Sequence, residues 1–204
     1  MLAKMTRRLF KAALATVAGL SLAAAALAQE KPTIRILVGF PPGAGTDALA
    51  RIYAEALSQA IGATVVVENK PGAGGLLANQ ALKQATPDSN SLLFVIDHQV
   101  VMLPLITKNP GFDVKKDMLP IARITNVYSC LIVPSGSPVT TLQSYADQVK
   151  KSPESGNYGV PAPGSKDQFM GYVVGQHYAV PVNAIPYRGS APAVLDVVGG
   201  QLPA

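Results

Sequence analysis

Apolar runs and amphipathic stretches alternate along residues 33–96. The apolar runs are short and rich in β-branched side chains, and they predict strands over 34–40, 63–68 and 92–96. The stretches between them repeat apolar residues at helical spacing and predict helices over 46–60 and 76–85. Nearly continuous apolar strands in a β-α-β-α-β order predict an α/β fold with a parallel sheet covered on both faces.

Turn residues set the limits of these elements. The sequence Pro41-Pro42-Gly43-Ala44-Gly45 predicts a tight turn after the first strand, and Thr46 is a suitable N-cap for the helix that follows. Gly62 is placed to end that helix. A second glycine-rich turn, residues 69–75, precedes the next helix.

The second half of the chain is also α/β but begins less regularly. Several prolines interrupt residues 98–128. The pattern then predicts strands over 130–133, 157–160 and 185–187, and helices over 141–151, 167–179 and 191–198. We therefore predict one domain over residues 29–100 and a second over residues 101–204.

Cys130 is the only cysteine. It lies in the apolar run 128–133, which predicts a buried strand and a structural thiol rather than a nucleophile. A single cysteine leaves no partner for an internal disulfide.

The N-terminus has the pattern of an export signal. Basic residues from Lys4 to Lys11 precede an apolar stretch over 12–27 that ends in the small-x-small sequence Ala26-Leu27-Ala28. We expect residues 1–28 to be a signal peptide cleaved after Ala28, which would place the protein in the periplasm. An uncleaved membrane anchor is the alternative, although the apolar stretch is short for a spanning helix, which needs about 20 residues.

The net charge of +5 comes largely from this segment, which carries four basic residues and no acidic one. The remaining chain has 13 basic and 12 acidic residues. This balance argues against a nucleic-acid partner.

Three strands run into glycine-containing loops that open helices, at residues 43–47, 164–167 and 188–191. A helix N-terminus offers unpaired N–H groups and a partial positive charge, so each loop is a potential anion site. In open α/β sheets such loops lie at the carboxyl ends of the strands, where ligands bind. Every βα unit needs a turn of this kind, however, so the loops alone leave a purely structural role open.

Enzyme signatures are weak by comparison. Residues 43–48 (GAGTDA) fit a G-x-G-x-x-A dinucleotide fingerprint, with Glu68 about twenty residues further on. Pro41-Pro42 and the export signal argue against that interpretation. The two histidines, His98 and His177, have no metal-ligand spacing. His98 follows a predicted strand and could face a cleft, but we interpret it as a capping or hydrogen-bonded residue rather than a catalytic one. No cofactor and no metal site are expected.

Several motifs resemble one known family. Residues 40–51 (FPPGAGTDALAR), 65–75 (VVVENKPGAGG), 186–193 (PYRGSAPA) and 199–201 (GGQ) are similar, in order and spacing, to motifs of Bug-type receptors. These receptors are the extracytoplasmic solute-binding proteins of tripartite tricarboxylate transporters.

The resemblance implies a two-domain, Venus-flytrap receptor that resembles periplasmic binding proteins and has parallel sheets flanked by helices. It implies a periplasmic protein that captures a small organic carboxylate, passes it to membrane permease subunits and catalyses no reaction. By position, the resemblance assigns ligand binding to Pro41, Gly43, Gly45, Thr46 and Asp47 of the first loop, and to Gly164, Ser165, Gly189 and Ser190 of the second domain.

The chain departs from the family pattern in three places. The loop over residues 160–172 lacks the family's usual His and Glu, and Asp97-His98 replaces small polar residues. Lys166 in that loop is expected to be a solvated lysine, with a cation that faces the site as the alternative. The chain also ends after Gly199-Gly200-Gln201, where the family continues with a strand. We therefore expect a receptor truncated at the C-terminus. A nucleotide-binding enzyme that uses the Gly43–Gly45 loop, or an inactive receptor fragment, are the alternatives.

Overall fold

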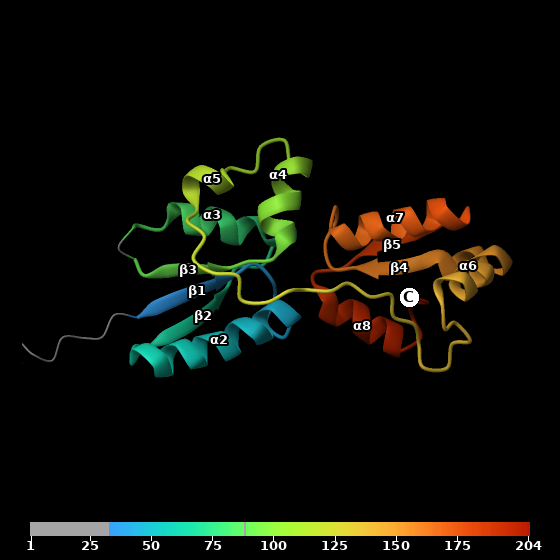
Figure 1. Cartoon of the computed structure of the whole chain (residues 1–204), viewed down its shortest axis with the longest axis horizontal. Helices are drawn as coiled ribbons and strands as arrows, with labels where there is room; N and C mark the ends of the chain where they lie inside the picture. The colour runs from blue at the N-terminus through green and yellow to red at the C-terminus, as the bar shows by residue number, and fades with distance from the viewer. Residues whose placement is uncertain (1–32, 88) are drawn as a thin grey trace, which may run out of the picture. The chain divides into compact units, whose positions relative to one another are not determined.

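The computed structural model describes residues 33–87 and 89–204, and the expected signal peptide lies outside these residues. Its first sheet has the strand order β2-β1-β3, with every neighbour parallel. The strands are β1 (Ile34–Val38), β2 (Val65–Asn69) and β3 (Ser91–Phe94). Helix α2 (Gly45–Ile61) lies along one side of this sheet and α3 (Leu76–Gln84) along the other (Figure 1). The predicted β-α-β-α-β unit with a parallel sheet is confirmed.

The core of this sheet forms between β1 and α2. Ile36 and Val38 of β1 are fully buried, and Ala50 and Ala54 of α2 pack against the same cluster. Small residues on α2 let the helix approach the strands closely. The predicted stop at Gly62 is also confirmed, because this residue adopts the left-handed conformation that glycine tolerates best.

Helix α2 begins earlier than its sequence suggests. Its N-cap is Ala44, without a side-chain cap, and Thr46 lies inside the first turn rather than at the cap. The reason is the turn before it: Gly43 has φ +82°, and the Ala44 amide donates to the Pro41 carbonyl at 3.2 Å. The chain therefore enters the helix two residues before the predicted cap.

A second sheet pairs β4 (Asn157–Val160) with β5 (Asn183–Pro186) in parallel. Helices α6 (Leu142–Lys151), α7 (Lys166–Tyr178) and α8 (Ser190–Val198) surround it, close to their predicted ranges. The core of this sheet joins Tyr145 and Val149 of α6 to Tyr158 and Val160 of β4. The last residue, Ala204, accepts a hydrogen bond from the Gly159 amide of β4 at 2.9 Å.

The short helices α4 (Leu103–Ile106) and α5 (Val114–Asp117) follow the predicted domain boundary at residue 100. Residues 110–117 nevertheless contact α3, since Asp117 at the end of α5 pairs with Lys83 at 3.0 Å and the Pro110 carbonyl accepts from the Gln80 side chain at 2.8 Å. The domain limits themselves stay a prediction.

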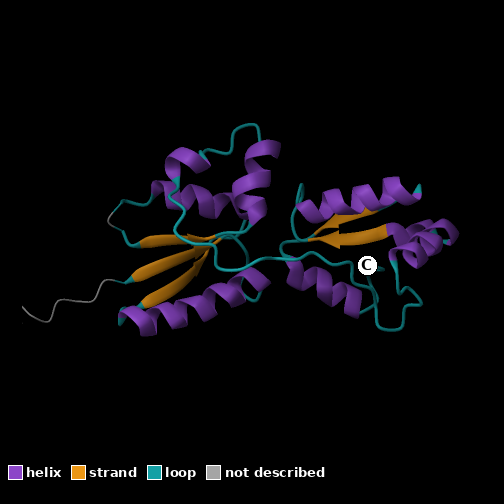
Figure 2. Cartoon of the chain, in the orientation of Figure 1, coloured by secondary structure: helices purple, strands orange, loops and turns teal. Residues whose placement is uncertain are grey.

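The predicted strand over 130–133 is wrong. Residues 118–134 form neither helix nor strand (Figure 2), and Cys130 is exposed rather than buried. The segment is apolar, but no neighbouring strand within the described residues supplies a ladder for it, and a strand requires one. Leu119, Ile121 and Tyr128 are each more than three-quarters exposed.

Among residues 33–87 and 89–204, no helix is both long and apolar enough to cross a membrane.

Candidate functional site

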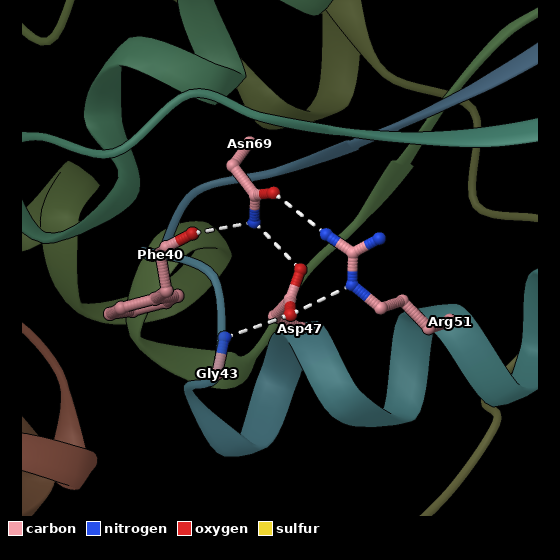
Figure 3. A network of polar contacts seen from close by, with 5 residues as sticks. All are labelled: Phe40, Gly43, Asp47, Arg51 and Asn69. Atoms are coloured by element: carbon pink, nitrogen blue, oxygen red, sulfur yellow. Dashed lines mark hydrogen bonds and ion pairs between the residues drawn. The ribbon is translucent and has the colours of Figure 1, made fainter.

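The first glycine loop is held in place by the buried carboxylate of Asp47 (Figure 3). One of its oxygens accepts hydrogen bonds from the Gly43 amide at 2.9 Å and from Arg51 Nε at 3.0 Å. The other accepts from the side-chain amide of Asn69 at 2.8 Å. The same Asn69 nitrogen donates to the Phe40 carbonyl at 3.0 Å, so the end of β2, the loop and the first turn of α2 form one network.

The electrostatics of this network follow from its hydrogen bonds. Burial alone raises the pKa of Asp47, but the hydrogen bonds from Arg51, Gly43 and Asn69 outweigh it and lower the pKa from 3.8 to about 2. Asp47 is therefore ionised at neutral pH with both oxygens engaged. It positions the loop, and it does not line the cavity described below.

The N-terminus of α2 is left open for a ligand. Ala44 provides no side-chain cap, and no described residue accepts a hydrogen bond from the amides of Gly45 and Thr46. Gly45 is exposed and Thr46 half-buried. Two free N–H groups at the positive end of a 17-residue helix favour an anion.

Helix α8 presents a second open N-terminus. Its N-cap, Gly189, has no side chain and adopts φ +99°, while its amide donates to the Pro161 carbonyl at 2.9 Å. The Ser190 amide has no acceptor among the described residues. Gly189 lies against the first loop: a Cβ added there would be 3.7 Å from the Ala44 Cβ and 3.8 Å from Pro41 Cδ.

The third loop is built differently, because its helix is capped by its own side chains. The Ser165 hydroxyl accepts from the Gln168 amide, and the Gln168 side chain accepts from the Gly164 amide at 2.7 Å. This reciprocal capping occupies groups that an open helix end would offer to a ligand. Lys166 is half-buried, lines the cavity described below and pairs with Asp97 at 2.9 Å, which fits a cation at the site better than a freely solvated loop lysine.

One cavity joins these loops. It is open to solvent and has a volume of about 2720 Å³, well above that of a typical small-ligand site, because it also extends along the exposed apolar segment 118–133. The residues predicted to bind ligand that line it are Gly45, Thr46, Ser165, Gly189 and Ser190. The remaining four, Pro41, Gly43, Asp47 and Gly164, do not line it, and the contacts above give them roles in shaping the loops.

Two polar residues at this site were not among the residues predicted to bind ligand. Asn69 ties Asp47 to Phe40, although the sequence marks it only as the start of a glycine-rich turn. His98 lines the cavity and is 2% exposed, and neither ring nitrogen has a hydrogen-bond partner among the described residues. The expectation of a hydrogen-bonded or capping histidine is therefore wrong. Its place directly after a strand, at the sheet edge where ligands bind, was the signal in the sequence that it could face a cleft.

The geometry does not favour a nucleotide at the first loop. The Gly43 amide, which a dinucleotide fingerprint would direct at a pyrophosphate, is engaged by Asp47. Glu68, the candidate ribose ligand, pairs with Lys70 at 2.7 Å and with Arg35 at 3.7 Å. Within residues 33–87 and 89–204, no group of three or more His, Cys, Asp or Glu side chains is placed to hold a metal ion.

Sequence comparison assigns most of the chain to one family. Residues 49–204 match the family described as tripartite tricarboxylate transporter family receptor. A UPF0065 protein of Bordetella bronchiseptica is 33% identical over 181 residues, which cover 88% of this chain and 53% of the relative. Protein BugT of Bordetella pertussis is 31% identical, over 84% of this chain and 53% of BugT. The chain thus spans about half the length of the curated relatives it matches.

Solved structures give the same result for the fold. A protein described as a periplasmic transporter aligns with a TM-score of 0.78 and 31% identity, over 84% of this chain and 57% of that one. An R. palustris protein solved with adipate aligns with a TM-score of 0.78 and 27% identity over the same shares. The periplasmic binding protein BugD aligns with a TM-score of 0.70 and 30% identity, again over 84% of this chain and 57% of BugD. The predicted likeness to periplasmic binding proteins is confirmed.

Proposed function

Because the chain belongs to the tripartite tricarboxylate transporter receptor family, we propose that it captures a small organic carboxylate in the periplasm and delivers it to the permease of such a transporter. The protein binds and releases its ligand and catalyses no reaction. Residues 1–28 direct its export and are removed after Ala28. Domain closure over the bound anion provides specificity, since a buried charge must be paired.

The observation that carries this proposal is the meeting of two open helix ends. The free amides of Gly45 and Thr46 on α2 and of Ser190 on α8 line the same cavity. Backbone amides at helix N-termini are suited to a carboxylate, because they combine donors with a partial positive charge. In this proposal these three residues bind one carboxylate directly.

The other predicted site residues hold the loops of the site in position and do not bind the ligand themselves. Gly43 and Asp47 fix the loop that presents the α2 amides, and Pro41 of the same loop lies against Gly189. Ser165 and Gly164 hold the α7 end of the cavity through their bonds with Gln168.

The ligand class follows from the chemistry and from one neighbour. An amide cluster recognises a carboxylate whatever chain it is attached to, so the cluster alone favours organic acids in general. The R. palustris protein was solved with adipate, which makes a six-carbon dicarboxylate a reasonable first ligand to test.

The test is a titration of the purified chain with mono-, di- and tricarboxylates, followed by thermal unfolding and calorimetry. A ligand present at 100 times its dissociation constant should stabilise the chain by about 2.7 kcal/mol. For a chain of this size, that corresponds to roughly 5–10 °C in melting temperature. Uncharged diamides of the same length are the matched control. Stabilisation by NAD instead of any acid would support the nucleotide-binding alternative, and no response to either would support an inactive fragment.

A further inference from the structure

His98 occupies an unusual position for a polar side chain. It opens a short helical turn, η2 (His98–Met102), just beyond the end of β3. Its side chain is almost completely buried, and both ring nitrogens lack a hydrogen-bond partner among the described residues. Buried polar groups in folded proteins are nearly always hydrogen-bonded, so an exception of this kind calls for an explanation.

The neighbouring residue shows that the local fold is able to satisfy buried polar groups. The Gln99 side chain donates to the Asn79 side chain at 3.0 Å and to the Gly75 carbonyl at 3.3 Å. Asn79 in turn donates to the Gln99 carbonyl at 2.9 Å. These bonds anchor the turn to the glycine-rich loop before α3, and thereby fix the place of His98.

The imidazole is enclosed by backbone and by charged groups. A Cβ on Gly74 would lie 2.5 Å from His98 Nε2 and 3.6 Å from the Ala162 Cβ, so the absent side chain of Gly74 makes room for the ring. Asp97 lies next to it in the sequence, and α7 contributes Lys166, paired with Asp97, and Asp167, which accepts from the Ser129 hydroxyl. Residues 71–75 bring no titratable group to the ring.

These charges decide which form of the ring suits the site. The carboxylates of Asp97 and Asp167 and the ammonium of Lys166 leave a net negative charge beside His98. While the imidazole is neutral, this charge disfavours an anionic ligand in the cavity. Burial nevertheless lowers the pKa of His98, and Asp97 and Asp167 only partly oppose it. An anion that enters the cavity adds negative charge and accepts hydrogen bonds, and both effects favour the protonated, imidazolium form of His98.

We propose that His98 is a ligand-binding residue of this cavity, whose imidazole takes up one proton as an organic anion binds and then donates a hydrogen bond to that anion. One carboxylate of the ligand binds to the α2 and α8 amides and a second polar group reaches His98, so a dicarboxylate binds more tightly than the monocarboxylate of equal length. The inference rests on the proposed function, which supplies the anion.

The test uses adipate and hexanoate as ligands for the purified chain. We expect adipate to bind at least tenfold more tightly than hexanoate, and at least tenfold more tightly at pH 6 than at pH 8. Calorimetry in buffers of different ionisation enthalpy should report uptake of about one proton at pH 7. In H98Q, which keeps a neutral donor, adipate binding should weaken at least tenfold and lose its pH dependence.

Two further measurements guard against a variant that is merely misfolded. The chain has only two histidines, and His177 is exposed, so a histidine NMR titration of the unaltered chain reports each ring separately. Saturating adipate should move the His98 resonances to the imidazolium position at pH 7 and leave those of His177 unchanged. H98L, which removes the unpartnered nitrogens, should melt at a higher temperature than the unaltered chain without ligand.

The outcomes separate the two ideas. Adipate binding that is equally tight in H98Q, or that leaves the His98 resonances unmoved, overturns the role of His98 and leaves the receptor proposal intact. Failure of every carboxylate to bind the unaltered chain overturns the receptor proposal and the role of His98 together. H177Q is the matched control and should behave like the unaltered chain in each assay.

Discussion

Gly189 lies against Ala44, such that a Cβ on Gly189 would be 3.7 Å from the Cβ of Ala44. Ala44 is the N-cap of α2 and Gly189 that of α8, so this contact brings two helix N-termini together. Both ends lack a side-chain cap, and their free amides line one cavity. The proposed carboxylate site depends on this one contact between Gly189 and Ala44.

Substitution of Gly189 tests the approach directly. Gly189 has φ +99°, which non-glycine residues rarely adopt, so G189A should lower the free energy of unfolding by about 1–2 kcal/mol. Relief of this backbone strain would move the N-terminus of α8, and carboxylate binding should therefore weaken as well. Urea unfolding and calorimetry measure the two effects, and unchanged values for both would show that the contact is unimportant.

Substitution of Gly45 separates binding from folding. Gly45 has an ordinary φ and no atom within 4 Å of an added Cβ, so G45A should fold as well as the unaltered chain or slightly better. The new methyl group projects from the first residue of α2, beside the amides proposed to bind the ligand. Affinity for the best carboxylate should therefore fall at least tenfold, or about 1.4 kcal/mol.

The control for G45A is G136A. Gly136 also has open space around it, lies in an exposed loop and does not line the cavity. G136A should change neither stability nor affinity. Equal affinities for G45A, G136A and the unaltered chain would contradict the assignment of the α2 amides.

The sequence predicted most of the fold because the signals involved are local. Apolar periodicity, Gly62 and the proline-rich turns depend on a few neighbouring residues, and the structure follows them closely in both sheets. The apolar run around Cys130 shows the limit of such signals. It has the composition of a buried strand, but burial requires a neighbouring element, and composition does not specify one.

The site was predicted less completely, for a related reason. The glycine loops are visible in the sequence, whereas the engagement of Gly43 by Asp47, and not by a ligand, depends on how a side chain folds back on its own loop. Likewise, no sequence pattern predicts whether the ring nitrogens of His98 have hydrogen-bond partners. Hydrogen-bond satisfaction is a property of the tertiary structure, and it decides which residues remain available for a ligand.

Removal of the Asp47 charge should loosen the first loop. D47N keeps the shape of the side chain but loses the charge-assisted hydrogen bond from Arg51, and it places an NH₂ group against one of the three donors. We expect the free energy of unfolding to fall by about 2–3 kcal/mol, since hydrogen bonds to charged groups contribute about 1.5–3 kcal/mol each. Carboxylate binding should weaken in parallel. E55Q, an exposed substitution on the same helix, should have little effect on either quantity.

The same carboxylate predicts a particular response to acid. The pKa of Asp47 is about 2 in the folded chain and 3.8 ordinarily, so its contribution is complete above pH 4 and is lost as the pH falls through 2. The contribution amounts to about 2 kcal/mol. In urea unfolding, the difference between the unaltered chain and D47N should therefore shrink between pH 4 and pH 2. A difference that stays constant over this range would show that the charge of Asp47 does not stabilise the fold.

Two tyrosines in the second sheet's core offer a matched pair of substitutions. Tyr145 is 3% exposed and its hydroxyl has no hydrogen-bond partner among the described residues, whereas the Tyr158 hydroxyl donates to the Gln168 carbonyl at 2.9 Å. Burial, with a smaller effect from Tyr158, raises the pKa of Tyr145 to about 12, so the hydroxyl is neutral at pH 7, where the two substitutions are compared.

Y145F removes a polar atom that is buried without a partner, so it should raise the free energy of unfolding by about 1 kcal/mol. Y158F removes a made hydrogen bond and leaves the Gln168 carbonyl without that donor, so it should lower the free energy by about the same amount. Urea unfolding of the two variants at pH 7 measures both values against the unaltered chain. Both substitutions delete the same hydroxyl oxygen. Changes of opposite sign in the free energy of unfolding would therefore isolate the effect of the hydrogen bond, whereas a decrease in both variants would show that the Tyr145 hydroxyl is hydrogen-bonded in solution.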